Sequence, residues 1–122
     1  MNLKEFIDMY DDPNSKVVVN NNRLKRIAAD RAWLIYALTD YEDIRKMEVV
    51  AFGHYDDELT IRVNIFTNKE LMYFYKNNID VEEDDIETIL DHLWLYLAYG
   101  AKLCLGDARS RYNTVKKYLG GE

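Results

Sequence analysis

Hydrophobic side chains recur at helical spacing in several stretches of this chain. The first stretch is residues 3 to 10, a short amphipathic helix that should end before Pro13, because the residue preceding a proline avoids the α region. A second stretch predicts a long helix over about residues 22 to 38, with asparagines before it as N-caps. Thr39 and Glu42 then have the spacing of a capping box, which predicts one or two further turns over residues 40 to 46.

Alternation of apolar and polar residues replaces the helical period between residues 47 and 66. The run from Leu59 to Ile65 alternates strictly, which predicts a hairpin with strands over about 47 to 55 and 58 to 66. Three consecutive valines predict a further short strand over residues 16 to 20. Residues 71 to 75 have two interpretations, a third strand of the sheet, which their aromatic side chains favour, or a helix capped by Thr67 and Glu70.

The second half of the chain predicts two more helices. An acidic run from Asp80 has the spacing of a helix N-terminus, so we expect a long helix over about residues 82 to 105, ended by Gly106. Trp94, Tyr96 and Tyr99 make this helix apolar on nearly every side, and they indicate either core packing or a protein interface. A final amphipathic helix should run to residues 120 and 121.

In chain order these elements predict an α+β fold, written α-(β)-α-β-β-β-α-α. We expect a small antiparallel three-stranded meander packed against helices, with the helix over residues 82 to 105 as the covering layer. The chain has 122 residues, of which 48% are hydrophobic. This length and composition suit a single globular domain over residues 1–122.

Cysteine content and the apolar segments indicate a compartment. Cys104 is the only cysteine, so no intramolecular disulfide can form and a reducing compartment is expected. The first eight residues are polar and acidic, unlike a signal peptide. The longest strongly apolar window, residues 93 to 101, is much shorter than the roughly twenty residues of a membrane-spanning helix. We therefore expect a cytoplasmic protein without membrane contact.

The sequence contains no catalytic or cofactor-binding motif. His54 and His92 lack the spacing of zinc ligands, and His54 is interpreted as an ion-pair partner of the neighbouring aspartates. The glycines form no phosphate-binding loop, and Cys104, between two leucines, is interpreted as a buried and inert side chain. We expect no cofactor, no metal and no catalytic residue. The alternative is an enzyme whose Asp, Glu, Tyr and His side chains are dispersed along the chain.

Charge is distributed unevenly along the chain. With 22 acidic and 16 basic residues the net charge is −6, which disfavours direct contact with nucleic acid. Two acidic stretches are the candidate partner-binding residues: Asp56, Asp57, Glu58, Asp80, Glu82, Glu83, Asp84, Asp85 and Glu87. The alternative for the second stretch is a solvated helix start at the positive end of the helix dipole. Residues 102 to 122 are net basic, so contact between copies of the chain is a further alternative.

In size, acidity and order of elements the chain resembles the small acidic inhibitors that phages and mobile elements direct at nucleic-acid-handling proteins. Some anti-CRISPR proteins of this kind imitate DNA. The resemblance covers no defined motif and is an analogy of fold. It implies a non-enzymatic inhibitor or adaptor whose acidic stretches dock on the basic surface of a partner protein. A homo-oligomeric structural or assembly protein, for example a homodimer, is the main alternative.

Overall fold

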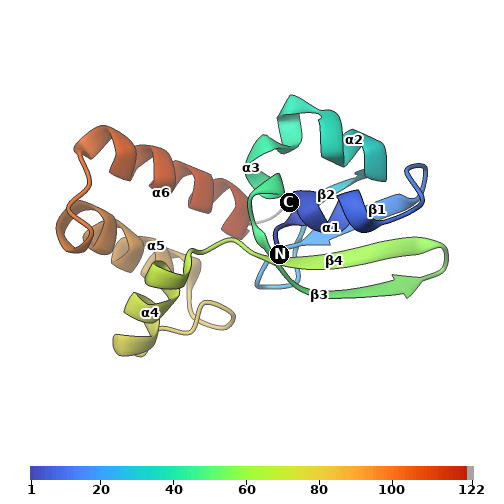
Figure 1. The fold of residues 1–122 in the computed structure, drawn as a ribbon. Coiled ribbons are helices and arrows are strands. Elements are labelled where there is room, and N and C mark those ends of the chain that lie inside the picture. Colours follow the sequence, from blue (N-terminus) through green and yellow to red (C-terminus); the bar gives the residue numbers. More distant parts are fainter. Residues whose placement is uncertain (121–122) are drawn as a thin grey trace. The chain divides into compact units, whose positions relative to one another are not determined.

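A computed structural model describes residues 1–120 of the chain, and their contacts group into two compact units (Figure 1). The first unit comprises residues 1–65 and contains the sheet, and the second comprises residues 66–120 and is helical. Each unit is described below by itself. The expectation of a single globular domain over residues 1–122 stays a prediction.

The first unit is built on a four-stranded sheet with the order β2-β1-β4-β3. β1 (Lys16–Asn20) pairs antiparallel with β2 (Arg26–Arg31), and β3 (Glu48–Tyr55) pairs antiparallel with β4 (Glu58–Asn64). Parallel pairing of β1 with β4 joins the two hairpins. The α+β class, the hairpin over residues 47 to 66 and the strand over residues 16 to 20 are confirmed. The predicted three-stranded meander matches only roughly, because the sheet has a fourth strand and one parallel pair.

Residues 22 to 31 form a turn and a strand, so the predicted helix over residues 22 to 38 is wrong in its first half. The buried Asn21 side chain accepts hydrogen bonds from the backbone N–H groups of Arg23 and Lys25, at 2.8 and 3.0 Å. Leu24 takes a φ of 61° in this turn. An asparagine side chain that bonds the following backbone closes a turn, and the chain returns alongside β1 as β2. The helix that remains is α2 (Ala32–Ala37).

Helices cover one face of this sheet. Alternate residues of the two central strands have at most 1% of their surface exposed: Val17, Val19, Leu59, Ile61 and Val63. α1 (Leu3–Met9) contacts β3, and α2 contacts β1 and β2. The helical layer described for this unit comes from α1 and α2, and residues 82 to 105 belong to the second unit. η1 (Thr39–Tyr41) and α3 (Glu42–Arg45) follow α2 and confirm the extra turns predicted there.

Polar contacts of the first unit hold these helices in place. The Tyr41 hydroxyl donates to Asp30 Oδ2 at 3.0 Å, and burial together with this hydrogen bond raises the pKa of Tyr41. Arg45 Nη1 donates to the backbone carbonyls of Ile35 and Leu38, at 2.8 and 2.5 Å. These bonds satisfy carbonyls at the end of α2, which have no partner within the helix. We interpret the hydrogen bonds of Tyr41 and Arg45 as structural contacts and assign them no functional role.

The second unit contains α4 (Asn68–Lys76), α5 (Ile86–Leu95) and α6 (Leu105–Gly120). A π-helical segment, η2 (Tyr96–Gly100), continues α5, and Lys102 at a φ of 56° reverses the chain before α6. α5 and α6 are antiparallel (Figure 1). The helix predicted over residues 82 to 105 thus begins later and ends earlier, and Gly106 lies in the first turn of α6. The predicted last helix is confirmed as far as residue 120, and Gly121 lies outside the described residues.

Residues 71 to 75 lie in α4, so the strand interpretation is wrong and the helix interpretation is confirmed. The Glu70 N–H donates to Thr67 Oγ1 at 3.2 Å, and the Thr67 N–H donates to Glu70 Oε1 at 2.9 Å. This reciprocal capping box satisfies two backbone donors at the helix start. Phe74 is buried, and its ring meets that of Phe66 edge-on, with the ring centroids 5.2 Å apart.

Among the described residues no helix combines the length and the apolar character needed to cross a membrane.

Replacing Thr67 with alanine is expected to lower the free energy of unfolding by about 1 kcal/mol, because the Glu70 N–H loses its acceptor. Urea denaturation followed by circular dichroism measures the loss. Thr88, exposed within α5, provides the matched control, and its replacement by alanine should change stability by no more than about 0.5 kcal/mol. Equal losses at the two positions would contradict a capping role.

Candidate functional site

The acidic run after α4 forms a hydrogen-bonded turn over residues 80 to 85, called here the acidic turn. The backbone N–H of Asp80 donates to Asp84 Oδ2 at 2.8 Å, and the N–H of Glu82 donates to Asp80 Oδ1 at 2.9 Å. The Asp84 N–H donates to the Asp80 carbonyl at 2.9 Å. The carboxylates of Asp80 and Asp84 thus satisfy backbone donors. These bonds define the shape of the turn, and the predicted helix start at residue 82 moves to Ile86.

Four other carboxylates of this stretch face solvent. Glu82, Glu83 and Asp85 are exposed in the acidic turn, and Glu87 is exposed in the first turn of α5. Within residues 1–120 the side chains of these four residues form no ion pair or hydrogen bond. The second unit therefore presents four carboxylates that no ion pair neutralises within the described residues. Glu87 and Asp85 at the start of α5 also interact favourably with the helix dipole.

The other predicted acidic stretch lies at the tip of the β3–β4 hairpin, in the first unit. Asp56 and Asp57 are exposed and take φ values of 48° and 65°. Two consecutive residues with positive φ are typical of a type I′ hairpin turn, in which aspartate is a favoured residue. Glu58 pairs with Lys16 across the parallel β1–β4 ladder at 3.0 Å. Turn geometry and an ion pair thus explain this stretch without a partner.

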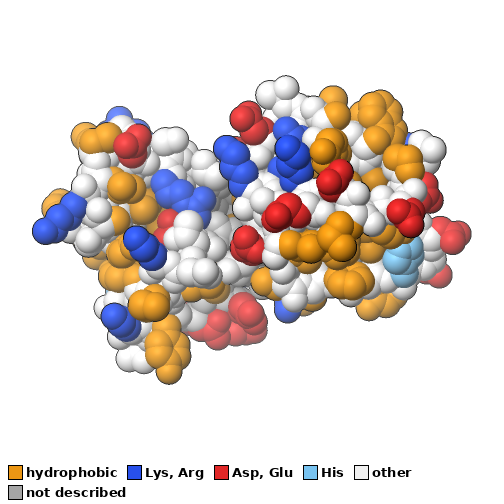
Figure 2. Space-filling model, viewed as in Figure 1, with side chains coloured by type: hydrophobic (Ala, Val, Ile, Leu, Met, Phe, Trp, Pro, Cys, Tyr) orange, Lys and Arg blue, Asp and Glu red, His pale blue; other side chains and the backbone are white. Residues whose placement is uncertain are grey.

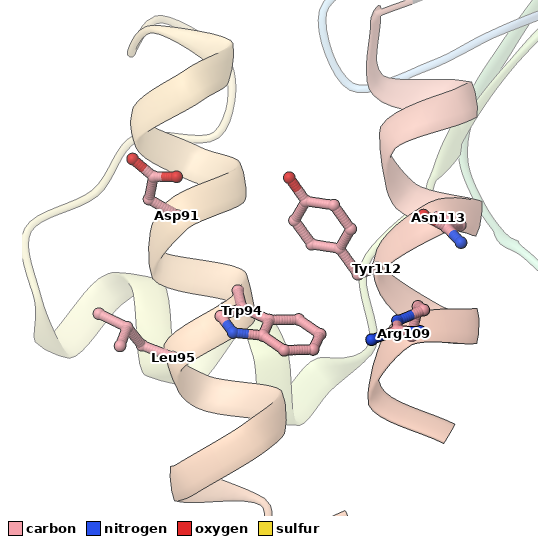
Figure 3. A pocket seen from close by; sticks show the side chains of 6 residues that line it. All are labelled: Asp91, Trp94, Leu95, Arg109, Tyr112 and Asn113. Carbon is pink, nitrogen blue, oxygen red and sulfur yellow. The ribbon is translucent and has the colours of Figure 1, made fainter. Parts of the chain in front are cut away.

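A groove between α5 and α6 is a feature that the sequence analysis missed (Figure 3). Its volume is about 600 Å³. The lining residues are Asp91, Trp94 and Leu95 of α5 and Arg109, Tyr112 and Asn113 of α6. Trp94 and Tyr112 meet edge-on, with ring centroids 5.7 Å apart. The apolar surface on nearly every side of the helix predicted over residues 82 to 105 was the sequence signal for such a groove. The sequence did not indicate that α6 forms the opposite wall.

The tyrosines and tryptophan of this region divide between the two predicted roles. Tyr96 is half-buried, and its ring lies 4.9 Å from that of Tyr73, which indicates packing within the unit. Trp94 is half-buried in the groove, whereas Tyr99 is 72% exposed. The region therefore contributes both to the core and to an exposed aromatic surface.

A second apolar surface lies on the first unit between α1 and β3, where Figure 2 shows hydrophobic side chains gathered on the visible face. Phe52 is 65% exposed, and its ring centroid lies 4.9 Å from that of Phe6. Val50, at the irregularity in the β3 ladder, is 51% exposed. Large exposed apolar surfaces are typical of interaction sites.

The side chains with candidate chemistry are scattered. His54 Nε2 lies 2.5 Å from the Tyr10 hydroxyl, so His54 contacts Tyr10 in place of the predicted aspartates. His92 is half-buried on α5, and its Nδ1 has no hydrogen-bond partner. Cys104 is exposed, so its predicted burial is wrong. In the described part of the chain no group of three or more His, Cys, Asp or Glu residues is placed to hold a metal ion.

Comparisons with known proteins assign no family to the chain. It matches no protein-family model, no curated protein and no solved structure. Function is therefore inferred from the acidic turn of the second unit.

Proposed function

We propose that this chain is a non-enzymatic protein-binding module, an inhibitor or adaptor that docks on a basic surface of a partner protein. The acidic turn is the observation that supports this proposal best. Asp80 and Asp84 bond its backbone, while Glu82, Glu83 and Asp85 project into solvent. Clustered like charges oppose the compact state, and a cationic partner offsets their repulsion.

The proposed partner is a nucleic-acid-handling protein of the cytoplasm. Such a protein concentrates lysine and arginine on the surface that receives phosphates, and this surface is complementary to a cluster of carboxylates. Because hydrogen bonds already order the backbone of the acidic turn, less conformational entropy is lost on docking. The size and net charge of −6 agree with the phage and mobile-element inhibitors that the chain resembles.

Reversing Glu82, Glu83 and Asp85 together to lysine is expected to slow association with the partner severalfold, because complementary charge accelerates diffusional encounter. The partner is isolated with the wild-type chain from the source cell and identified by mass spectrometry. Surface plasmon resonance then measures the association rate over a salt series. The wild-type rate should fall as salt rises, because ions screen exposed charges.

The matched control reverses three exposed acids of the first unit, Asp8, Asp11 and Glu42, to lysine. It changes the net charge by the same amount and should keep most of the wild-type association rate. Circular dichroism shows whether both variants remain folded. Equal slowing by the two variants would contradict a specific role of the acidic turn. If the wild-type association rate did not depend on salt, and the reversal of Glu82, Glu83 and Asp85 did not change it, the acidic turn would be only a solubilising segment.

A further inference from the structure

The groove between α5 and α6 has walls of opposite charge. On α5, Asp91 projects beside Trp94, and on α6, Arg109 projects from the opposite wall near Tyr112 (Figure 3). Lys116 lies one turn after Tyr112, on the same face of α6, because residues four apart are neighbours on a helix. Asp91, Arg109 and Lys116 are exposed, and within residues 1–120 none of them forms an ion pair. The charges of both walls are therefore available to a partner.

Between the charged walls the groove is apolar. The rings of Trp94 and Tyr112 form its centre, and Leu95 is 49% exposed beside them. Aromatic side chains at the centre of a concave surface, surrounded by charged residues, are typical of protein interfaces. Covering these side chains removes apolar surface from water, which favours association.

We propose that a second copy of this chain covers the groove, so that two α5–α6 hairpins pack face to face as a four-helix arrangement. A two-fold axis parallel to the helices places α5 of each copy over α6 of the other. The wall with Asp91 of each copy then faces the wall with Arg109 and Lys116 of the other copy, so the dimer contains this contact twice. A groove that carries both signs on opposite walls is complementary to itself.

Charge complementarity favours a second copy over a uniformly basic helix. A basic helix in the groove would satisfy Asp91 but would bring like charge against Arg109 and Lys116, which costs free energy. A second copy satisfies both walls. The proposed dimer is independent of the proposed function, because that function depends on Glu82, Glu83 and Asp85 of the acidic turn.

Sedimentation equilibrium of the full chain over a micromolar concentration series tests the dimer. The mass should approach twice the 14.5 kDa of one chain. Leu95→Lys should return it to that of one chain, because a lysine on α5 would be buried against the basic wall of the other copy. Met72→Lys is the matched control, since Met72 is 59% exposed on α4, outside the groove. This control should leave the dimer intact, and circular dichroism verifies that both variants fold.

Charge exchange between the walls tests the arrangement of the two copies. Asp91→Lys and Arg109→Glu should each raise the dimer dissociation constant about tenfold, because each gives the facing positions 91 and 109 the same sign of charge. An equimolar mixture of the two variants should associate about as tightly as the wild type. In the mixed pair, positions 91 and 109 again carry opposite charges wherever the two walls face each other.

Three results would overturn this proposal. The first is the mass of one chain at every concentration, the second is a dimer that Leu95→Lys leaves intact, and the third is a mixture that associates no better than either variant alone. Each result concerns the α5–α6 groove and leaves the partner measurement on the acidic turn unaffected. Failure of the dimer and failure of the proposed function are thus distinguishable.

Discussion

Replacing Arg111 with alanine is expected to lower the free energy of unfolding by about 3–5 kcal/mol. Arg111 Nε donates to Glu70 Oε2 at 2.9 Å, and Nη2 donates to Glu70 Oε1 at 2.6 Å, which joins α6 to α4. Glu70 is only 3% exposed. Without the guanidinium, the folded state would bury a carboxylate whose cation is missing, and the cost of removing that charge from water would no longer be offset.

Urea unfolding followed by circular dichroism measures this loss. Lys69→Ala is the matched control, because Lys69 is an exposed cation of α4 beside Glu70, and it should change stability by no more than about 0.5 kcal/mol. The double variant Glu70→Gln with Arg111→Met should recover part of the loss, because no buried charge remains. A loss for Arg111→Ala no larger than that of the lysine control would show that the ion pair is not buried in solution.

Replacing Leu93 with alanine is expected to cost about 2–5 kcal/mol, from lost burial and from the cavity that the side chain leaves. Leu93 is fully buried on α5, and the nearby Leu90 and Leu97 are 6% and 3% exposed. The same urea experiment measures the effect. Leu105→Ala is the control, since Leu105 is 60% exposed at the start of α6.

The shape of the Leu93 site provides a second test. Leu93→Met keeps the side-chain volume nearly constant and should cost less than about 1.5 kcal/mol. A loss of about 0.5 kcal/mol or less for Leu93→Ala, as at an exposed site, would mean that Leu93 does not contribute to the core.

The acidic stretches illustrate how far a candidate site follows from the sequence. Their charge is a property of composition and was predicted. Two other features were not predicted. Asp80 and Asp84 accept hydrogen bonds from the backbone of the acidic turn, and Lys16 forms an ion pair with Glu58. The Lys16–Glu58 contact requires the parallel pairing of β1 with β4, whose residues lie far apart in the sequence. The α5–α6 groove was missed for the same reason, since each wall belongs to a different helix.

Local sequence patterns were sufficient to predict the elements whose periodicity matches their burial. Leu59, Ile61 and Val63 alternate in the chain and lie on one buried face of β4, and Ala108, Val115 and Leu119 form the buried stripe of α6. Such patterns are local, because each element carries its own apolar face and needs only a surface on which to bury it.

β2 and the order of the sheet depend on contacts between residues that lie apart in the sequence. Ala28 fits the apolar stripe of a helix as well as a strand, and intrinsic preferences of this kind amount to only about 1 kcal/mol or less per residue. The turn at Asn21 and the ladder with Val19 outweigh them. The sequences of β1 and β4 do not indicate that the two strands pair in parallel. The hydrogen bonds of a ladder join backbone groups, which are nearly the same for every residue type.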